Sequence, residues 1–245
     1  MLLNVGISLN AYYLLQLMKQ GINELIAQDL QWQAFLTWVS QKSRDVTADK
    51  KPVTVRAFYF DLALARALGL LGSTLDLTRA LDRNFTCNLE RTLALDLALD
   101  RALAFGQVVD LTPDPNLAFE RVLERALAHA RNFDRMLERA LQQIKEQLPD
   151  TGRDAKRFKQ WWSAHGKTWT EQLRAVMIEY RSLGHNWQFS ERQKEAIKQY
   201  YVANSMLVNW LNSNCCLTDM VREEIEETLL LPIAEISQLS ASRYF

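Results

Sequence analysis

The tripeptide Gly166-Lys167-Thr168 contains the residue types that most suggest nucleotide chemistry. It matches the second half of a phosphate-binding loop, G-x-x-x-x-G-K-[ST], whose glycines let backbone N–H groups converge on phosphates. The first glycine of that loop falls on Trp161, and its bulk opposes such a turn. A buried strand should precede the loop, but residues 153–165 are charged and have a helical pattern. We therefore predict no enzyme activity and no catalytic, cofactor-binding or metal-binding residue.

A helix boundary accounts for the same tripeptide. The glycine would end one helix and Thr168 would cap the next, with an acid three residues later as its capping-box partner. Two more caps of this kind are predicted: Ser190, which is followed by Gln193 at the third helical position, and Thr218.

Four acidic residues near the C-terminus have side chains that could bind a metal ion. They are Glu223, Glu224, Glu226 and Glu227. Because Val221, Ile225 and Leu229 form the apolar stripe of the same helix, we interpret the acids as its solvated face.

The cysteines and the N-terminal residues both favour a cytoplasmic protein. Cys87, Cys215 and Cys216 have no C-x-x-C spacing and no nearby histidine, so we expect three free thiols in a reducing compartment. Residues 1–18 carry no charge, but they include polar side chains and follow no basic segment. We predict neither a signal peptide nor a membrane span.

Apolar residues recur at three- and four-residue steps through most of the chain, which predicts an all-α fold. We expect a multi-helix bundle or irregular helical array with a compact C-terminal helical domain. The predicted domains are residues 1–148, which contain a tract rich in Ala, Leu, Asp and Arg, and residues 149–245.

Residues 116–148 are predicted to form one long helix with an apolar seam at alternating four- and three-residue steps. The seam residues are Phe119, Leu123, Ala126, Ala130, Phe133, Leu137, Ala140 and Ile144. The spacing suits a coiled coil, but we expect an antiparallel partner helix within one bundle.

Two large aromatic residues, Trp187 and Phe189, lie in the short link between Gly184 and Ser190. Polar residues are the default in such a link. The two rings therefore either anchor the link to the bundle or form a patch for a partner, and we expect anchoring.

The C-terminal sequence resembles a known family. The segments "GHNWQFSERQKEAIKQYYVANSMLVNWLNSNC" (184–215) and "VREEIEETLLLPIAEI" (221–236) resemble the C-terminal helical region of bacterial, chiefly cyanobacterial, NACHT-domain NTPases. "NAYYLLQLMKQGI" (10–22) and "VRAFYFDLALARAL" (55–68) are similar to the same proteins.

The resemblance implies a role in signal transduction of the NLR type, which is associated with phage defence. In such proteins the C-terminal region is thought to sense a trigger or hold the off state of a NACHT nucleotide switch. This sequence has no positions that match the NTPase or the effector. We expect a non-enzymatic sensor or scaffold that binds protein, with a NACHT NTPase in trans as a partner. A split gene product, a free-standing sensor and a non-functional remnant remain open.

The alternative function is nucleic-acid binding through the Arg-rich tract. Lys+Arg and Asp+Glu both number 29, so the chain has no overall field to attract polyanions. Acidic residues interleave with the arginines of the tract and cancel their field. The residues concerned are Arg66, Arg79, Arg83, Arg91 and Arg101 and the acids Asp61, Asp76, Asp82, Asp96 and Asp100. We expect neither nucleic acid nor membrane as a partner.

Overall fold

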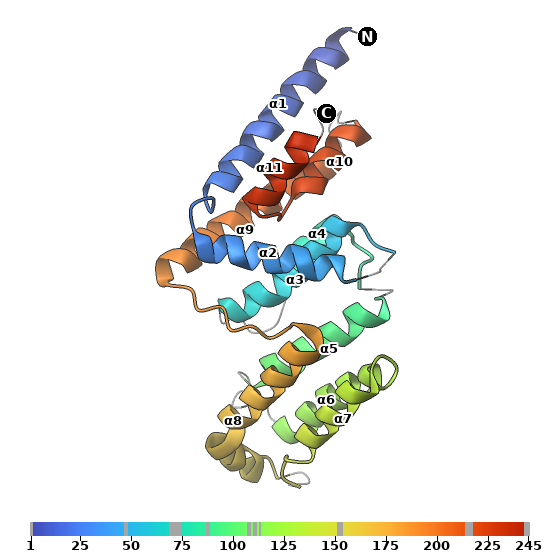
Figure 1. The fold of residues 1–245 in the computed structure, drawn as a ribbon, viewed down its shortest axis with the longest axis vertical. Helices are drawn as coiled ribbons and strands as arrows, with labels where there is room; N and C mark the ends of the chain where they lie inside the picture. Colours follow the sequence, from blue (N-terminus) through green and yellow to red (C-terminus); the bar gives the residue numbers. More distant parts are fainter. Residues whose placement is uncertain are drawn as a thin grey trace. The chain divides into compact units, whose positions relative to one another are not determined.

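The computed structural model describes residues 2–46, 49–68, 75–86, 89–106, 109, 112, 114–150, 154–213 and 218–242, with side chains from Tyr12 onward. Over these residues the fold is all-α, as predicted, with eleven helices (Figure 1). The helices are α1 (Leu2–Glu24), α2 (Leu30–Arg44), α3 (Pro52–Ala67), α4 (Asp76–Leu81), α5 (Arg91–Phe105), α6 (Pro115–Arg131), α7 (Arg135–Lys145), α8 (Ala155–Arg181), α9 (Glu191–Asn212), α10 (Asp219–Thr228) and α11 (Ile233–Ser242). The three cysteines of the thiol prediction, Cys87, Cys215 and Cys216, lie outside the described residues.

The chain forms two compact units, each built from segments that are distant in sequence. Unit 1 comprises Met1–Asp61, Thr74–Cys87 and Trp187–Phe245, and unit 2 comprises Leu62–Ser73 and Asn88–Asn186. The boundary between the units falls within α3. The predicted sequence domains, 1–148 and 149–245, stay a prediction.

Helix α3 is buried on every side from Val53 to Ala65. Its sequence is mostly apolar around the whole helix, and such a helix is stable only inside a core. Two charged residues, Arg56 and Asp61, lie in this buried stretch. Because neither can reach bulk water, each needs polar partners from other elements.

Asp61 finds its partner at the start of α4. The N-cap of α4, Leu75, has a left-handed backbone and makes no side-chain capping bond. In its place Asp61 Oδ2 accepts hydrogen bonds from Thr78 N at 3.0 Å and Thr78 Oγ1 at 2.7 Å. Burial raises the pKa of the Asp61 carboxyl to about 7. A residue of α3 therefore caps a helix that begins fifteen positions later in the sequence.

Unit 2 packs α5 to α8 against one another, with α6 and α7 as a helical hairpin. The prediction of one long helix over 116–148 is wrong, because the chain turns between Arg131 and Arg135. Asp134 Oδ1 accepts a hydrogen bond from Met136 N at 2.7 Å and so starts a new helix. Phe133, the predicted seam residue at this turn, is 42% exposed. Helices α6 and α7, which carry the two halves of the seam, contact each other.

The tract rich in Asp and Arg forms ion pairs inside unit 2. Asp96 on α5 is fully buried and accepts two hydrogen bonds from the Arg181 guanidinium, at 2.7 and 2.9 Å. One turn later on α5, Asp100 lies 2.6 Å from Arg66 Nη1. Burial raises the pKa of the Asp100 carboxyl, and Arg66 opposes that change. These aspartates act as internal partners of arginine.

The predicted helix boundary at Gly166 is wrong, since α8 runs without a break from Ala155 to Arg181. Thr168 is an exposed residue in the middle of this helix, so the prediction that it caps a helix is also wrong. The glycine has a packing role. A Cβ at Gly166 would lie 2.7 Å from the indole Nε1 of Trp162, one turn earlier. The close approach of this ring, which sequence pattern does not reveal, explains the glycine.

Replacement of Gly166 by alanine should destabilise the protein. Alanine favours a helix over glycine by about 1 kcal/mol, but crowding in a packed site costs about 1–3 kcal/mol. We expect a net loss of about 1 kcal/mol by denaturant unfolding. Gly21→Ala in α1 is the matched control because no atom lies within 4 Å of its new Cβ. It should stabilise by about 0.5–1 kcal/mol, and equal stabilisation by both variants would contradict the packing role.

Candidate functional site at the end of α10

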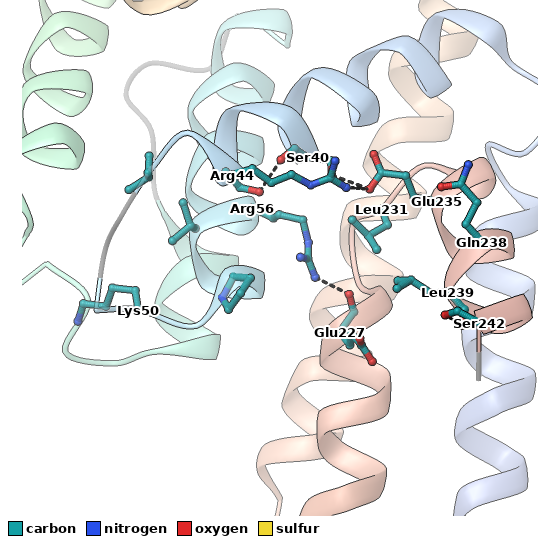
Figure 2. Close-up of a pocket in the computed structure, with 14 residues that line it drawn as sticks. Ser40, Arg44, Lys50, Arg56, Glu227, Leu231, Glu235, Gln238, Leu239 and Ser242 are labelled. Atoms are coloured by element: carbon teal, nitrogen blue, oxygen red, sulfur yellow. Dashed lines mark hydrogen bonds and ion pairs between the residues drawn. The ribbon is translucent and has the colours of Figure 1, made fainter. Parts of the chain in front are cut away.

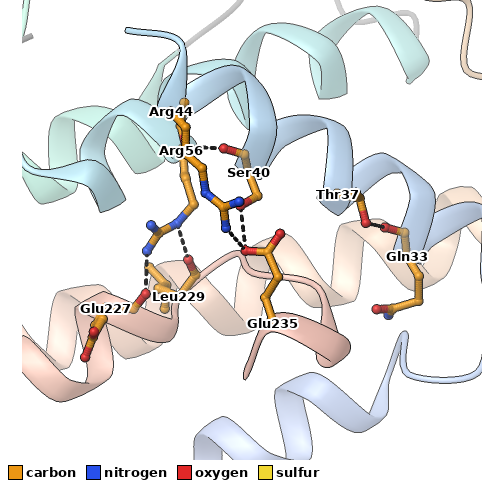
Figure 3. Close-up of polar contacts among 9 residues, drawn as sticks. Gln33, Thr37, Ser40, Arg44, Arg56, Glu227, Leu229 and Glu235 are labelled. Atoms are coloured by element: carbon orange, nitrogen blue, oxygen red, sulfur yellow. Dashed lines mark hydrogen bonds and ion pairs between the residues drawn. The ribbon is translucent and has the colours of Figure 1, made fainter. Parts of the chain in front are cut away.

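The buried guanidinium of Arg56 binds the C-terminal carbonyls of α10. Arg56 Nε donates to Leu229 O at 2.8 Å, and Nη2 donates to Glu227 O at 2.8 Å (Figure 3). Nη2 also donates to Glu226 O at 2.9 Å. The last carbonyls of a helix lack partners within it and carry the negative end of its dipole, so a cation suits this place. Burial lowers the pKa of Arg56 to about 10.

Helix α2 holds the beginning of α11 beside this contact. Glu235 Oε2 accepts a hydrogen bond from Ser40 Oγ at 2.8 Å and pairs with Arg44 (Figure 3). Gln33 Oε1 accepts from the backbone N–H of Ile233, the first residue of α11, at 2.9 Å. The turn from α10 into α11 is therefore bound by α3 at one end and α2 at the other.

A pocket of about 700 Å³ opens beside these contacts, with walls from α2, α3, α10 and α11 (Figure 2). The cations in its wall already have internal partners. Arg56 binds α10, Arg44 pairs with Glu235, and Lys50 lies 3.0 Å from Asp82. These polar groups bind one another, so the arrangement serves to hold helices together.

The acidic residues of α10 have two different environments. Glu223 and Glu227 are exposed, as expected of a solvated face. That interpretation is wrong for Glu226, which is buried and pairs with Lys51 at 2.8 Å. Glu224 is half-buried and accepts a hydrogen bond from Gln16 of α1 at 3.2 Å. Within the described residues, no group of three His, Cys, Asp or Glu side chains could hold a metal ion.

Two predicted caps lie at the starts of α9 and α10. Ser190 and Gln193 form the full capping box, with Gln193 N donating to Ser190 Oγ at 3.3 Å and Ser190 N donating to Gln193 Oε1 at 2.9 Å. Gln193 also donates to Asp29, the N-cap of α2, at 2.8 Å, which joins the starts of two helices. Thr218 Oγ1 accepts from Val221 N at 3.4 Å and caps α10.

Trp187 and Phe189 lie against α2. Phe189 is buried and stacks on Trp32, with ring centroids 4.5 Å apart and planes at 6°. The ring of Trp187 meets Phe35 edge to face at 5.3 Å and 86°. Both residues of α2 are at most 1% exposed. These contacts support the interpretation of Trp187 and Phe189 as anchors of the link.

Sequence reasoning missed Arg56 and Glu235. One signal was available for the arginine. In "VRAFYFDL" the charged residue stands in a helix that is apolar on all sides, so its guanidinium must find an internal partner. The identity of that partner, carbonyl groups 170 to 173 positions away, has no signature in the sequence.

A segment in the C-terminal part of the chain matches a protein family. Residues 137–232 match the family model described as NACHT C-terminal Helical domain 2. The match runs from α7 to the end of α10 and confirms the resemblance in this segment. No curated protein and no solved structure shows a significant match to the chain. Of the helices in the described residues, none is long and apolar enough to cross a membrane.

The segment that matches the family model is held by helices that precede it. Arg56 and Trp32 lie outside residues 137–232, whereas their partners Leu229 and Phe189 lie inside. In unit 2, buried Asp96 of α5 likewise binds an arginine of the matched segment. The matched segment therefore depends on earlier helices for its core contacts.

Trp187→Ala should lower the free energy of unfolding by about 3 kcal/mol, since loss of a large ring from a packed aromatic cluster leaves a cavity. Met220→Ala in the same segment is the matched control, because that side chain is 74% exposed. It should change stability by less than about 0.5 kcal/mol. Thermal and denaturant unfolding measure both variants, and equal stabilities would exclude an anchoring role.

Proposed function

We propose that this chain is a non-enzymatic sensor or scaffold module of a NACHT-type signalling system, of the kind that acts in phage defence. The observation that carries the proposal is the family match over residues 137–232. The module acts by binding proteins, and a NACHT NTPase supplied in trans is its expected partner. A cytoplasmic location stays a prediction.

An apolar face on α1 supports protein binding. Tyr13, Leu14 and Leu17 are 62%, 50% and 65% exposed. Their spacing of three and four residues puts them on one side of the helix. Residues 1–18 carry no charged side chain, so no ionic group interrupts this face. Clusters of exposed apolar residues commonly mark protein-binding sites.

Two features weigh against the other function classes. The backbone of Gly166-Lys167-Thr168 lies in the interior of α8, where N–H groups bond within the helix and cannot converge on a phosphate. Arg66 and Arg181 are bound to buried aspartates, so these arginines are not available for phosphate contacts. The proposal therefore includes neither NTP hydrolysis nor nucleic-acid binding.

Co-purification with a NACHT NTPase from the same genome tests the proposal. Leu17→Asp places a charge on the apolar face of α1 and should reduce capture of the NTPase at least about tenfold, because a charge cannot be buried unpaired in an apolar contact. Met136→Asp is the matched control, since Met136 is also exposed, at 56%, but belongs to unit 2.

The control should capture the NTPase as the unchanged chain does, and both variants should keep the wild-type melting temperature. Absence of capture by the unchanged chain, or equal loss in both variants, would contradict the proposal.

A further inference from the structure

Lys19 of α1 is a buried lysine in the wall of a second pocket. The side chain is only 7% exposed, and the pocket of about 410 Å³ lies among α1, α10 and α11. Lysine is almost never buried to this degree unless it is paired. No hydrogen bond or ion pair of the Lys19 ammonium is present among the described residues.

The charges around Lys19 come from three helices. Burial, the largest effect, and the nearby Arg56 of α3 lower the pKa of Lys19, and Glu224 of α10 opposes them; the resulting pKa is about 7. Glu24 of α1 lines the same pocket, and the Tyr12 hydroxyl donates to Glu224 at 3.4 Å. The α11 residues in the wall have no titratable group. Neutral, nucleophilic amine is therefore present at Lys19 at neutral pH.

We propose that Lys19 is a reactive amine that forms an imine with small uncharged aldehydes entering this pocket. The volume lies in the range of small-molecule sites. Ile233 and Ile236 provide an apolar wall, and the carboxylates of Glu24 and Glu224 disfavour anionic carbonyl compounds.

The reaction needs no further reactant. The Nζ lone pair attacks the carbonyl carbon, and a C–N bond forms. The two protons of the neutral amine pass to the carbonyl oxygen, which leaves as one water molecule. The product is a C=N bond between the aldehyde carbon and Nζ, with no net oxidation or reduction. This inference is independent of the proposed protein-binding role, which concerns the exposed face of α1.

Reductive labelling of the full chain tests the proposal. The chain is incubated with butanal and cyanoborohydride, which traps the imine, and labelled peptides are quantified by mass spectrometry. Lys198, with a side chain 57% exposed, is the internal reference. At pH 7 Lys19 should be labelled at least about tenfold faster than Lys198, because an ordinary lysine is almost wholly protonated there.

Two further readouts separate a pocket effect from general amine chemistry. In concentrated urea the two rates should become equal. Butanal should label Lys19 faster than glyoxylate, its anionic comparator. Labelling of Lys19 no faster than Lys198, a rate ratio that survives in urea, or a preference for glyoxylate would overturn the proposal.

Discussion

The bond between the Arg56 guanidinium and the end of α10 is the contact on which the C-terminal helices depend. Three carbonyls accept hydrogen bonds there, and the chain then reverses at Leu230, which has a φ of 60°, to begin α11. A buried carbonyl without a donor costs as much as a lost hydrogen bond. Arg56 cannot reach bulk water from within α3 either. The buried carbonyls at the end of α10 therefore need the Arg56 guanidinium as a donor, and the guanidinium needs these carbonyls as acceptors. The two groups are 170 positions apart in the sequence.

Other buried charged side chains also bind polar groups of another helix. Asp61 supplies the cap that α4 lacks, and Asp96 binds an arginine of α8. In each case the polar partner comes from another helix, so helices that look independent in the sequence are bound together within their own unit. The segment at residues 137–232, which matches the family model, takes part in these contacts through Arg181. A partner on α1 would touch a helix that packs against α9 and α10, which belong to that segment.

Features that depend on neighbouring residues could be predicted from the sequence. The all-α fold follows from apolar spacing, and the capping box at Ser190 needs only a serine and a glutamine three residues later. The role of Gly166 could not be predicted, because glycine is common both at helix ends and where two groups pack closely. Only the position of the Trp162 ring shows that close packing applies here. The turn at Asp134 was missed because the apolar seam continues on both sides of it. The partners of Arg56 are backbone carbonyl groups. Because every residue has such a group, the sequence does not indicate which ones accept hydrogen bonds from the arginine.

The most direct measurement compares Arg56→Met with Arg44→Met by denaturant unfolding and by hydrogen exchange of the amides of α10 and α11. Arg44 is the matched control because its side chain is 64% exposed, and an exposed ion pair contributes at most about 1 kcal/mol. Loss of a charged donor from buried carbonyls should cost about 3 kcal/mol in Arg56→Met and accelerate exchange in both helices. Equal stability and equal exchange in the two variants would contradict the central role of Arg56.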